Sequence, residues 1–260
     1  MSQRVGRPER RRHVSTSTLG IIGTGAVGAA LARRAVDAGL DVVLSNSRGP
    51  QTLAGLVDDL GPRAHAATPA EAALAAELVI TAVPLTAHKQ LPHAELAGKT
   101  VIDPMNYAPL RPEWEIPELD SNELTSSELV QRHLVGARVV KALHNIGPRQ
   151  LLDLFRPADA HDRTALPLSG DDPAAREEAI ALLDVLGFDA VDLGTLAESW
   201  RSEPNTPLYA IPYVGQLPAG LTTVPDVVAW AQAAPGVPVP AARVKELAAA
   251  AVRGPAGFRM

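Results

Sequence analysis

The sequence predicts an α/β fold in which helices cover both faces of a doubly wound, mostly parallel sheet. Short apolar runs typical of buried strands alternate with segments that carry helix signals, and this alternation indicates a parallel sheet. The chain has 260 residues, of which 46% are hydrophobic and 20% are charged, a balance typical of a globular protein with a substantial core. We therefore expect one compact unit with a small helical C-terminal extension.

Eight segments are predicted to form strands. The first, residues 18–22, reads Thr-Leu-Gly-Ile-Ile, and such short apolar runs between turn residues favour strands buried on both faces. The other expected strands cover residues 41–44, 63–67, 78–83, 100–103, 138–143, 163–168 and 188–193.

Capping signals predict the helices between these strands. Thr68 precedes a segment with Pro69 at its first position and Glu71 at its third, which is typical of a capping box. Asp172 can cap a helix that begins at Pro173. Further helices are expected over residues 29–38, 52–60, 126–134 and 240–253.

The composition excludes several classes of protein. The chain has no cysteine, so disulfides, thiolate nucleophiles and iron–sulfur clusters are excluded. Its net charge of −5 argues against a nucleic-acid partner. No apolar run could cross a membrane, no signal peptide is recognisable, and the histidines lack metal-ligand spacing. We expect a cytoplasmic protein with no metal and no membrane partner.

The most informative motif is Gly23-Thr24-Gly25-Ala26-Val27-Gly28, which follows the first expected strand and opens a helix. In this context a GxGxxG pattern predicts dinucleotide binding rather than an ordinary tight turn. Gly23 allows the turn, Gly25 lets the backbone approach a pyrophosphate, and Gly28 lets helix and strand pack closely. The helix N-terminus offers free N–H groups to the phosphates.

The end of the second expected strand favours NADP(H) over NAD(H). NAD sites usually place Asp or Glu there to hold the ribose hydroxyls, but this chain reads Ser45-Asn46-Ser47-Arg48. Hydroxyls and a guanidinium accept a 2′-phosphate, which a carboxylate would repel. An ordinary polar loop is the alternative.

Ligands of open parallel sheets bind beyond the carboxyl ends of the strands. Val83 and Pro84 follow the fourth expected strand and Asn106 follows the fifth, so all three are candidates for contact with the cofactor. For Pro84 a simple strand stop, and for Asn106 a turn position, are equally plain interpretations.

His144, at the end of the sixth expected strand, is the remaining titratable candidate. It could act as a general acid, orient a ligand by a hydrogen bond, or be a structural histidine. No GxSxG motif is present, so hydrolase chemistry has no support.

Together these segments resemble the NADPH-dependent reductases of the deazaflavin coenzyme F420. The resemblance covers roughly residues 19–213 and rests on the glycine motif, the Ser45–Arg48 turn, Val140–Ile146 and Ser169–Asp172. It implies a Rossmann-type domain, usually in a homodimer, that transfers a hydride between nicotinamide C4 and the deazaflavin ring.

The resemblance also implies roles for individual residues. Gly23, Thr24, Ala26 and Val27 would contact the NADP backbone, and Ser45, Ser47 and Arg48 its 2′-phosphate. Ala142, His144 and Ile146 would line the face where the deazaflavin stacks, and Pro207 and Leu208 would close the pocket.

Three units are expected along the chain: a disordered basic tail (1–17), the NADP-binding domain (18–195) and an extension completing the substrate pocket (196–260). Two other functions remain open. One is NADPH-dependent reduction of a small imine or carbonyl compound, with His144 or Tyr209 as the acid. The other is a non-catalytic NADP(H) sensor.

Overall fold

The structure is a computed structural model that describes residues 18–221 and 223–257. The basic tail that the sequence predicts to be disordered lies outside the described residues.

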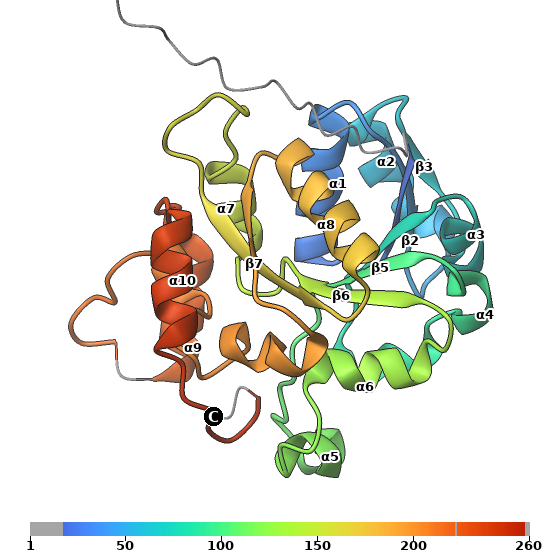
Figure 1. Ribbon diagram of the computed structural model, residues 1–260. Coiled ribbons are helices and arrows are strands. Elements are labelled where there is room, and N and C mark those ends of the chain that lie inside the picture. Colours follow the sequence, from blue (N-terminus) through green and yellow to red (C-terminus); the bar gives the residue numbers. More distant parts are fainter. Residues whose placement is uncertain (1–17, 222, 258–260) are drawn as a thin grey trace, which may run out of the picture.

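One sheet of eight strands forms the centre of the molecule, in the order β3-β2-β1-β4-β5-β6-β7-β8 (Figure 1). All neighbouring strands are parallel except β6 and β7, where Val140 pairs with Gly170 and Ala142 with Leu168. The order of the first six strands is that of the Rossmann fold, so the predicted fold class is confirmed. The strands are β1 (Thr18–Ile22), β2 (Asp41–Ser45), β3 (Ala64–Ala66), β4 (Leu78–Thr81), β5 (Thr100–Asp103), β6 (Arg138–Ala142), β7 (Ala165–Gly170) and β8 (Asp189–Asp192).

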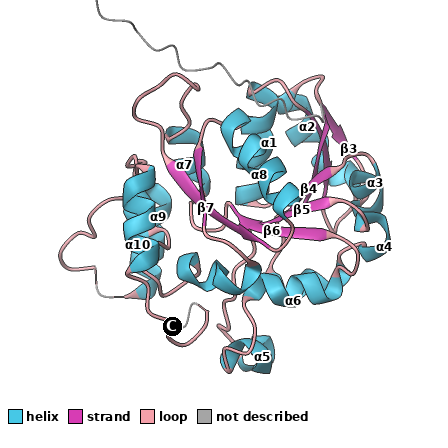
Figure 2. Cartoon of the chain, in the orientation of Figure 1, coloured by secondary structure: helices cyan, strands magenta, loops and turns pink. Residues whose placement is uncertain are grey.

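Helices cover both faces of this sheet (Figure 2). The α-helices are α1 (Ala26–Asp37), α2 (Ala54–Leu60), α3 (Pro69–Leu74), α4 (His93–Leu96), α5 (Pro117–Asp120), α6 (Ser126–His133), α7 (Pro148–Asp153), α8 (Pro173–Val185), α9 (Val224–Ala233) and α10 (Ala241–Ala249). Short 3-10 helices are η1 (Pro50–Leu53), η2 (Leu85–Gln90), η3 (Pro112–Trp114), η4 (Leu196–Ser202) and η5 (Ile211–Tyr213).

Two apolar clusters fill the space between sheet and helices. One contains the inner sides of α1, α7, α8 and α10, and the other contains those of α3, α4 and α6. Tyr213 and Leu247, from the predicted C-terminal extension, belong to the first cluster together with Ile21 of β1. The extension therefore shares a core with the sheet.

The predicted caps are present in the structure. Thr68 and Glu71 form a complete capping box at α3, and Asp172 accepts a hydrogen bond from the N–H of Ala175 at α8. A second capping box, between Thr125 and Glu128, starts α6. Caps are local interactions, which is why three or four residues suffice to predict them.

Some predicted boundaries are wrong by a few residues. The strand expected to reach residue 83 ends at Thr81, because the chain turns there beside Gly23. The terminal helix expected over 240–253 ends at Ala249, and the chain then continues without regular secondary structure to Pro255, which cannot continue a helix.

Within residues 18–221 and 223–257, no helix combines the length and the apolar character that crossing a bilayer demands.

Candidate functional site

The glycine turn between β1 and α1 is closely packed at two of its three glycines. Gly23 has a φ of +100°, and a Cβ atom there would lie 2.2 Å from the carbonyl oxygen of Ala82. A Cβ on Gly28 would lie 1.9 Å from the carbonyl oxygen of Gly23. Both positions therefore require glycine for steric reasons.

Gly25 differs from the other two, because it faces open space. It is the N-cap of α1, has an ordinary φ of −73°, and a Cβ there would meet no atom within 4 Å. The neighbouring Thr24 hydroxyl is buried and has no hydrogen-bond partner among the described residues. Free backbone N–H groups, an unpaired hydroxyl and the absence of an acidic residue in the first turn fit a phosphate group.

The loop after β2 lies directly beside this turn, because the Gly23 N–H donates to the carbonyl of Ser45 at 2.9 Å. Ser47 and Arg48 are exposed, and the Arg48 guanidinium has no ion pair or hydrogen bond in the described part of the chain. Asn46 instead supports the loop, since its amide nitrogen donates to Thr52 and its amide oxygen accepts from the Arg48 N–H.

Ser45 is separated from the exposed residues of its motif. It is fully buried, and its hydroxyl donates to the carbonyl of Ile21 at 3.4 Å. In this conformation the side chain joins β2 to β1. The hydroxyl available at the loop surface is that of Ser47, because the Thr52 hydroxyl is bonded to Asn46 and Gly49.

Val83 and Pro84 follow β4 on the other side of the glycine turn. A Cβ on Gly23 would lie 2.8 Å from Val83 Cγ1, so Val83 and the turn are in contact. Pro84 is exposed and forms the N-cap of η2. The structure thus brings these two residues and the glycine motif to the same edge of the sheet.

Asn106 and His144 connect the turns that follow β5 and β6. The Asn106 side-chain amide donates to the carbonyl oxygen of His144 at 2.8 Å. Leu143, between β6 and His144, has a φ of +62°, a left-handed conformation that is unfavourable for leucine. Such strain is commonly found at functional sites, where surrounding contacts maintain it.

The His144 ring is buried and held by η4. Its Nε2 lies 2.9 Å from the Ser202 hydroxyl and 3.1 Å from the Ser202 carbonyl oxygen. Burial, and secondarily the positive charge of Lys141, lowers the pKa of His144 well below its ordinary value. The imidazole is therefore neutral near pH 7 and cannot serve as a cationic acid.

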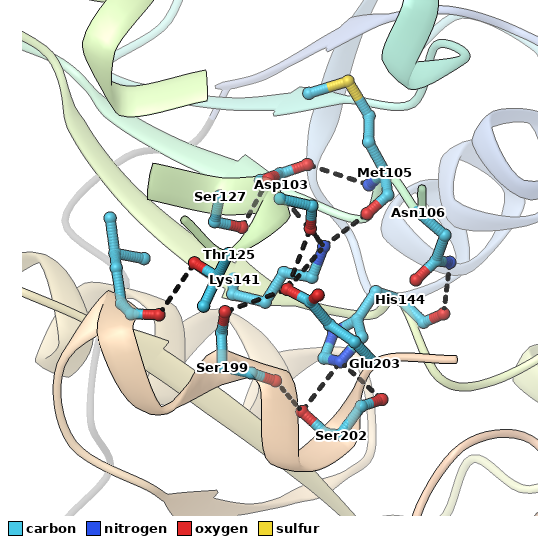
Figure 3. A network of polar contacts seen from close by, with 12 residues as sticks. Asp103, Met105, Asn106, Thr125, Ser127, Lys141, His144, Ser199, Ser202 and Glu203 are labelled. Carbon is cyan, nitrogen blue, oxygen red and sulfur yellow. Dashed lines mark hydrogen bonds and ion pairs between the residues drawn. The ribbon is translucent and has the colours of Figure 1, made fainter. Parts of the chain in front are cut away.

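A buried ionic network lies next to His144 (Figure 3). Lys141 Nζ is 3.9 Å from Asp103 Oδ2 and 4.0 Å from Glu203 Oε1, donates to Ser126 at 2.8 Å, and also donates to the Met105 carbonyl. Lys141 and Asp103 are completely buried. A buried charge is tolerated only when it is paired, so this lysine holds β5, β6, α6 and the Glu203 segment together.

The remaining predicted substrate residues surround the end of β6. Ala142 and Ile146 are buried, and Leu208 is buried beside them, with its carbonyl oxygen accepting from the Asn145 amide at 3.3 Å. Pro207 is exposed and lines a neighbouring surface hollow with Ile211 and Arg243. The segment around Leu208 therefore covers the turn that contains His144.

A second hollow, of about 190 Å³, adjoins the same turn. It lies between Gly147, Tyr209 and α9, and its lining is mostly apolar. Burial raises the pKa of Tyr209, so its phenol is protonated at neutral pH. The Tyr209 hydroxyl makes no hydrogen bond within the described residues.

Sequence reasoning missed the ionic network and the helix α9. Asp103, Lys141 and Glu203 are far apart in the sequence, and nothing local marks their meeting. Helix α9 did carry a signal, because Thr223 caps it by accepting from the Asp226 N–H. Among the described residues no cluster of three or more His, Cys, Asp or Glu could hold a metal ion.

A comparison with protein families matches residues 18–107 to the family described as NADP oxidoreductase, coenzyme F420-dependent. A protein of Escherichia coli strain K12, YjhV, is 43% identical over 53 residues, which cover 20% of this chain and 39% of YjhV.

Two solved structures are similar over most of their length. The hypothetical protein SMa0349 from Sinorhizobium meliloti is 32% identical, with a TM-score of 0.65, over 75% of this chain and 94% of that protein. The candidate F420-dependent NADP-reductase of Arthrobacter sp. FB24 is 26% identical, with a TM-score of 0.59, over 71% of this chain and 87% of that protein.

Proposed function

The chain belongs to the family of coenzyme F420-dependent NADP oxidoreductases, and from this premise we propose that it transfers a hydride between NADP(H) and coenzyme F420. NAD(P)-dependent oxidoreduction is the chemistry that the family shares. The identity of the second reactant is the proposed part.

The exposed Arg48 beside the glycine turn is the observation that carries the choice of NADP(H). Its guanidinium has no partner among the described residues, and no carboxylate stands in the Ser45–Arg48 loop to repel a 2′-phosphate. Gly25 and Thr24 lie at the start of α1, where the pyrophosphate of a dinucleotide would be held.

The proposed reaction needs position more than it needs acid–base side chains. Both reactants supply the hydride chemistry themselves when bound, so the protein contributes orientation and exclusion of water. Ala142 and Ile146 offer an apolar wall at the end of β6, and Leu208 covers it. A neutral His144 agrees with this, because it can hold a ligand by a hydrogen bond without transferring a proton.

The test is to mix purified protein, NADPH and oxidised F420 and to follow loss of the deazaflavin absorption band. The proposal expects bleaching that is stoichiometric with NADPH oxidation. Tight NADPH binding without bleaching would overturn F420 as the reactant. Tight binding without turnover of any acceptor would point instead to an NADP(H) sensor.

Tyr209 favours a second candidate, the reduction of a small imine or carbonyl compound. Its protonated phenol has no hydrogen-bond partner among the described residues and faces an apolar hollow near His144. A neutral phenol can donate a proton to a nitrogen or oxygen that gains charge during hydride transfer. If this candidate is correct, Tyr209→Phe abolishes imine or carbonyl reduction, whereas F420 reduction does not depend on the phenol.

A further inference from the structure

Glu203 lies at the start of the cover, the segment of residues 202–210 that packs over the turn after β6. Its side chain is only 9% exposed, although acidic side chains are rarely buried unless they are paired. Its Oε1 accepts hydrogen bonds from the hydroxyls of Ser126 at 2.8 Å and Ser199 at 2.9 Å, and Lys141 Nζ lies 4.0 Å away. One carboxylate oxygen therefore joins α6, β6 and η4 (Figure 3).

A path of hydrogen bonds leads from Glu203 to the ring of His144. The Ser199 hydroxyl donates to Glu203, and the Ser199 carbonyl accepts from the Ser202 hydroxyl at 3.1 Å. His144 Nε2 lies 2.9 Å from the Ser202 hydroxyl and 3.1 Å from the Ser202 carbonyl oxygen. A carbonyl oxygen can only accept, so the proton of the neutral ring lies on Nε2. The place of η4 thus decides which ring nitrogen carries the proton.

The cover is attached to β6 and its following turn at both ends. Near its start, Glu203 faces Lys141 of β6. At its far end, the Asn145 side chain donates to the Leu208 carbonyl at 3.3 Å, and the Asn145 carbonyl accepts from the Ala210 N–H at 3.1 Å. Hydrogen bonds to charged groups contribute more than neutral ones. The carboxylate is therefore the stronger of the two attachments.

Glu203 is not needed to balance the charge of Lys141, because Asp103 already pairs with that lysine at 3.9 Å. Asp103 accepts hydrogen bonds from the Ser127 hydroxyl and the Met105 N–H, which lie outside η4 and the cover. A second buried carboxylate is costly to remove from water. Its presence indicates a role that Asp103 does not fill, and the contacts of Glu203 place that role at η4 and the cover.

We propose that Glu203 is a positioning residue for the reaction. Through Ser199 and Ser202 it fixes the orientation and the tautomer of His144, and through its own main chain it fixes the start of the cover. The inference rests on the proposed function only in placing the second reactant under the cover. Loss of the carboxylate should disturb the site of that reactant and spare the nucleotide, since this path of bonds lies outside residues 23–28 and 45–48.

The decisive variant is Glu203→Leu, which removes the carboxylate but fills the space. Glu203→Gln is the conservative variant, because an amide oxygen can still accept from both serine hydroxyls. In both variants Lys141 keeps Asp103 as its partner. Glu198→Gln is the matched control, since it is the same substitution within η4 at a partly exposed carboxylate that pairs with Arg201. Thermal unfolding verifies the fold of each variant.

Nitrogen-15 NMR of the histidine rings reports the tautomer of His144 without any reactant, and His144→Phe assigns the signal. Wild type and Glu198→Gln should carry the proton on Nε2, whereas Glu203→Leu should show a mixture of the two tautomers. Ser199→Ala keeps the ion pair and breaks the path to Ser202, so it should shift the signal in the same direction and decides the matter if Glu203→Leu does not fold. A His144 signal that is identical in wild type and in the folded variants overturns the proposal.

Steady-state kinetics with NADPH and F420 separate positioning from a general loss of structure. Glu203→Leu should raise the KM for F420 about tenfold or more, as expected for lost hydrogen bonds to a charged group, and leave the Kd for NADPH unchanged. Glu203→Gln should restore most of the affinity for F420. An equal weakening of both reactants overturns the positioning role. If wild type does not reduce F420, the proposed function fails, and the tautomer of His144 alone decides this inference.

Discussion

The side-chain amide of Asn106 donates to the main-chain carbonyl of His144 at 2.8 Å, so this hydrogen bond joins the turns after β5 and β6. The two residues are 38 positions apart, and their strands are neighbours in the sheet. This bond fixes which end of the Asn106 amide is available to a ligand. It also supports the chain just after the left-handed Leu143.

Replacing Arg48 with Ala should weaken NADPH binding by about ten- to a hundredfold, the range expected for loss of a charge-assisted hydrogen bond. NADH, which has no 2′-phosphate, should bind the variant as it binds wild type. Titration calorimetry with both nucleotides measures the difference. Arg33→Ala on α1, whose guanidinium lies 4.0 Å from Asp59, is the control and should change neither affinity. An equal loss for NADH would contradict the assignment.

Alanine substitutions at two glycines of one motif should have opposite consequences. Gly25→Ala should leave the unfolding temperature nearly unchanged but impair nucleotide binding, because its Cβ would occupy the open space over the helix start. Gly28→Ala should lower the free energy of unfolding by about 2 kcal/mol or more, since its Cβ would overlap the Gly23 carbonyl. Thermal unfolding and NADPH titration of both variants provide the comparison. A destabilised Gly25→Ala would show that this space is needed for folding.

Stability should fall in mildly acidic solution because of His144. Burial lowers the pKa of His144 in the folded protein, so between that pKa and about 6.5 the unfolded chain binds a proton that the folded protein does not. The contribution to stability is complete above about pH 6.5 and is lost as the pH falls toward the folded pKa. Urea unfolding at about pH 7.5 and about pH 5.5 measures this loss.

His144→Phe should make the stability less dependent on pH over the same interval. His88, whose pKa is lowered mainly by burial, contributes with the same sign. His88→Phe should therefore also reduce the pH dependence of the free energy of unfolding, but by less than His144→Phe does. A wild-type stability that is constant across this interval would show that His144 takes up a proton in the folded protein.

Lys141→Met should destabilise the protein by about 3–5 kcal/mol, because it leaves Asp103 and Glu203 buried without a cation. Lys99→Met is the control. Lys99 is also buried, but its partner Glu77 is exposed, so its loss leaves no buried carboxylate without a cation and should cost less. Urea unfolding of both variants gives the two free energies. Similar values would mean that the Lys141 network adds no stability beyond that of a lysine paired with one exposed carboxylate.

The parts of the fold that depend on local signals could be predicted from the sequence. Thr68 and Asp172 cap helices through residues three positions away, and the strand β1 and the glycine turn follow one another directly. The alternation of such segments is enough to indicate the sheet.

The part of the site around His144 could be predicted only in part. His144 was recognisable as a histidine at a strand end, but its lowered pKa depends on burial in the folded chain, and its hydrogen-bond partner Ser202 is 58 positions away. Lys141 likewise pairs with Glu203 only once the later part of the chain has packed against β6. No local sequence pattern predicts such contacts, and the left-handed conformation of Leu143 cannot be predicted from its residue type.

The reversal of direction between β6 and β7 determines at which edge of the sheet each later loop emerges. The loops after β1 to β6 emerge at the edge that holds the glycine turn, whereas those after β7 and β8 emerge at the opposite edge. Asp171 and Asp172, which follow β7, therefore lie away from the glycine turn, and they accept hydrogen bonds from the N–H groups of Leu196 and Ala175 at the starts of η4 and α8. Residues 202–210 return to the first edge, where Ser202 contacts His144 and Leu208 contacts Asn145. In the proposed function, the cover over the second reactant therefore comes from one late stretch of sequence that is separate from the nucleotide half.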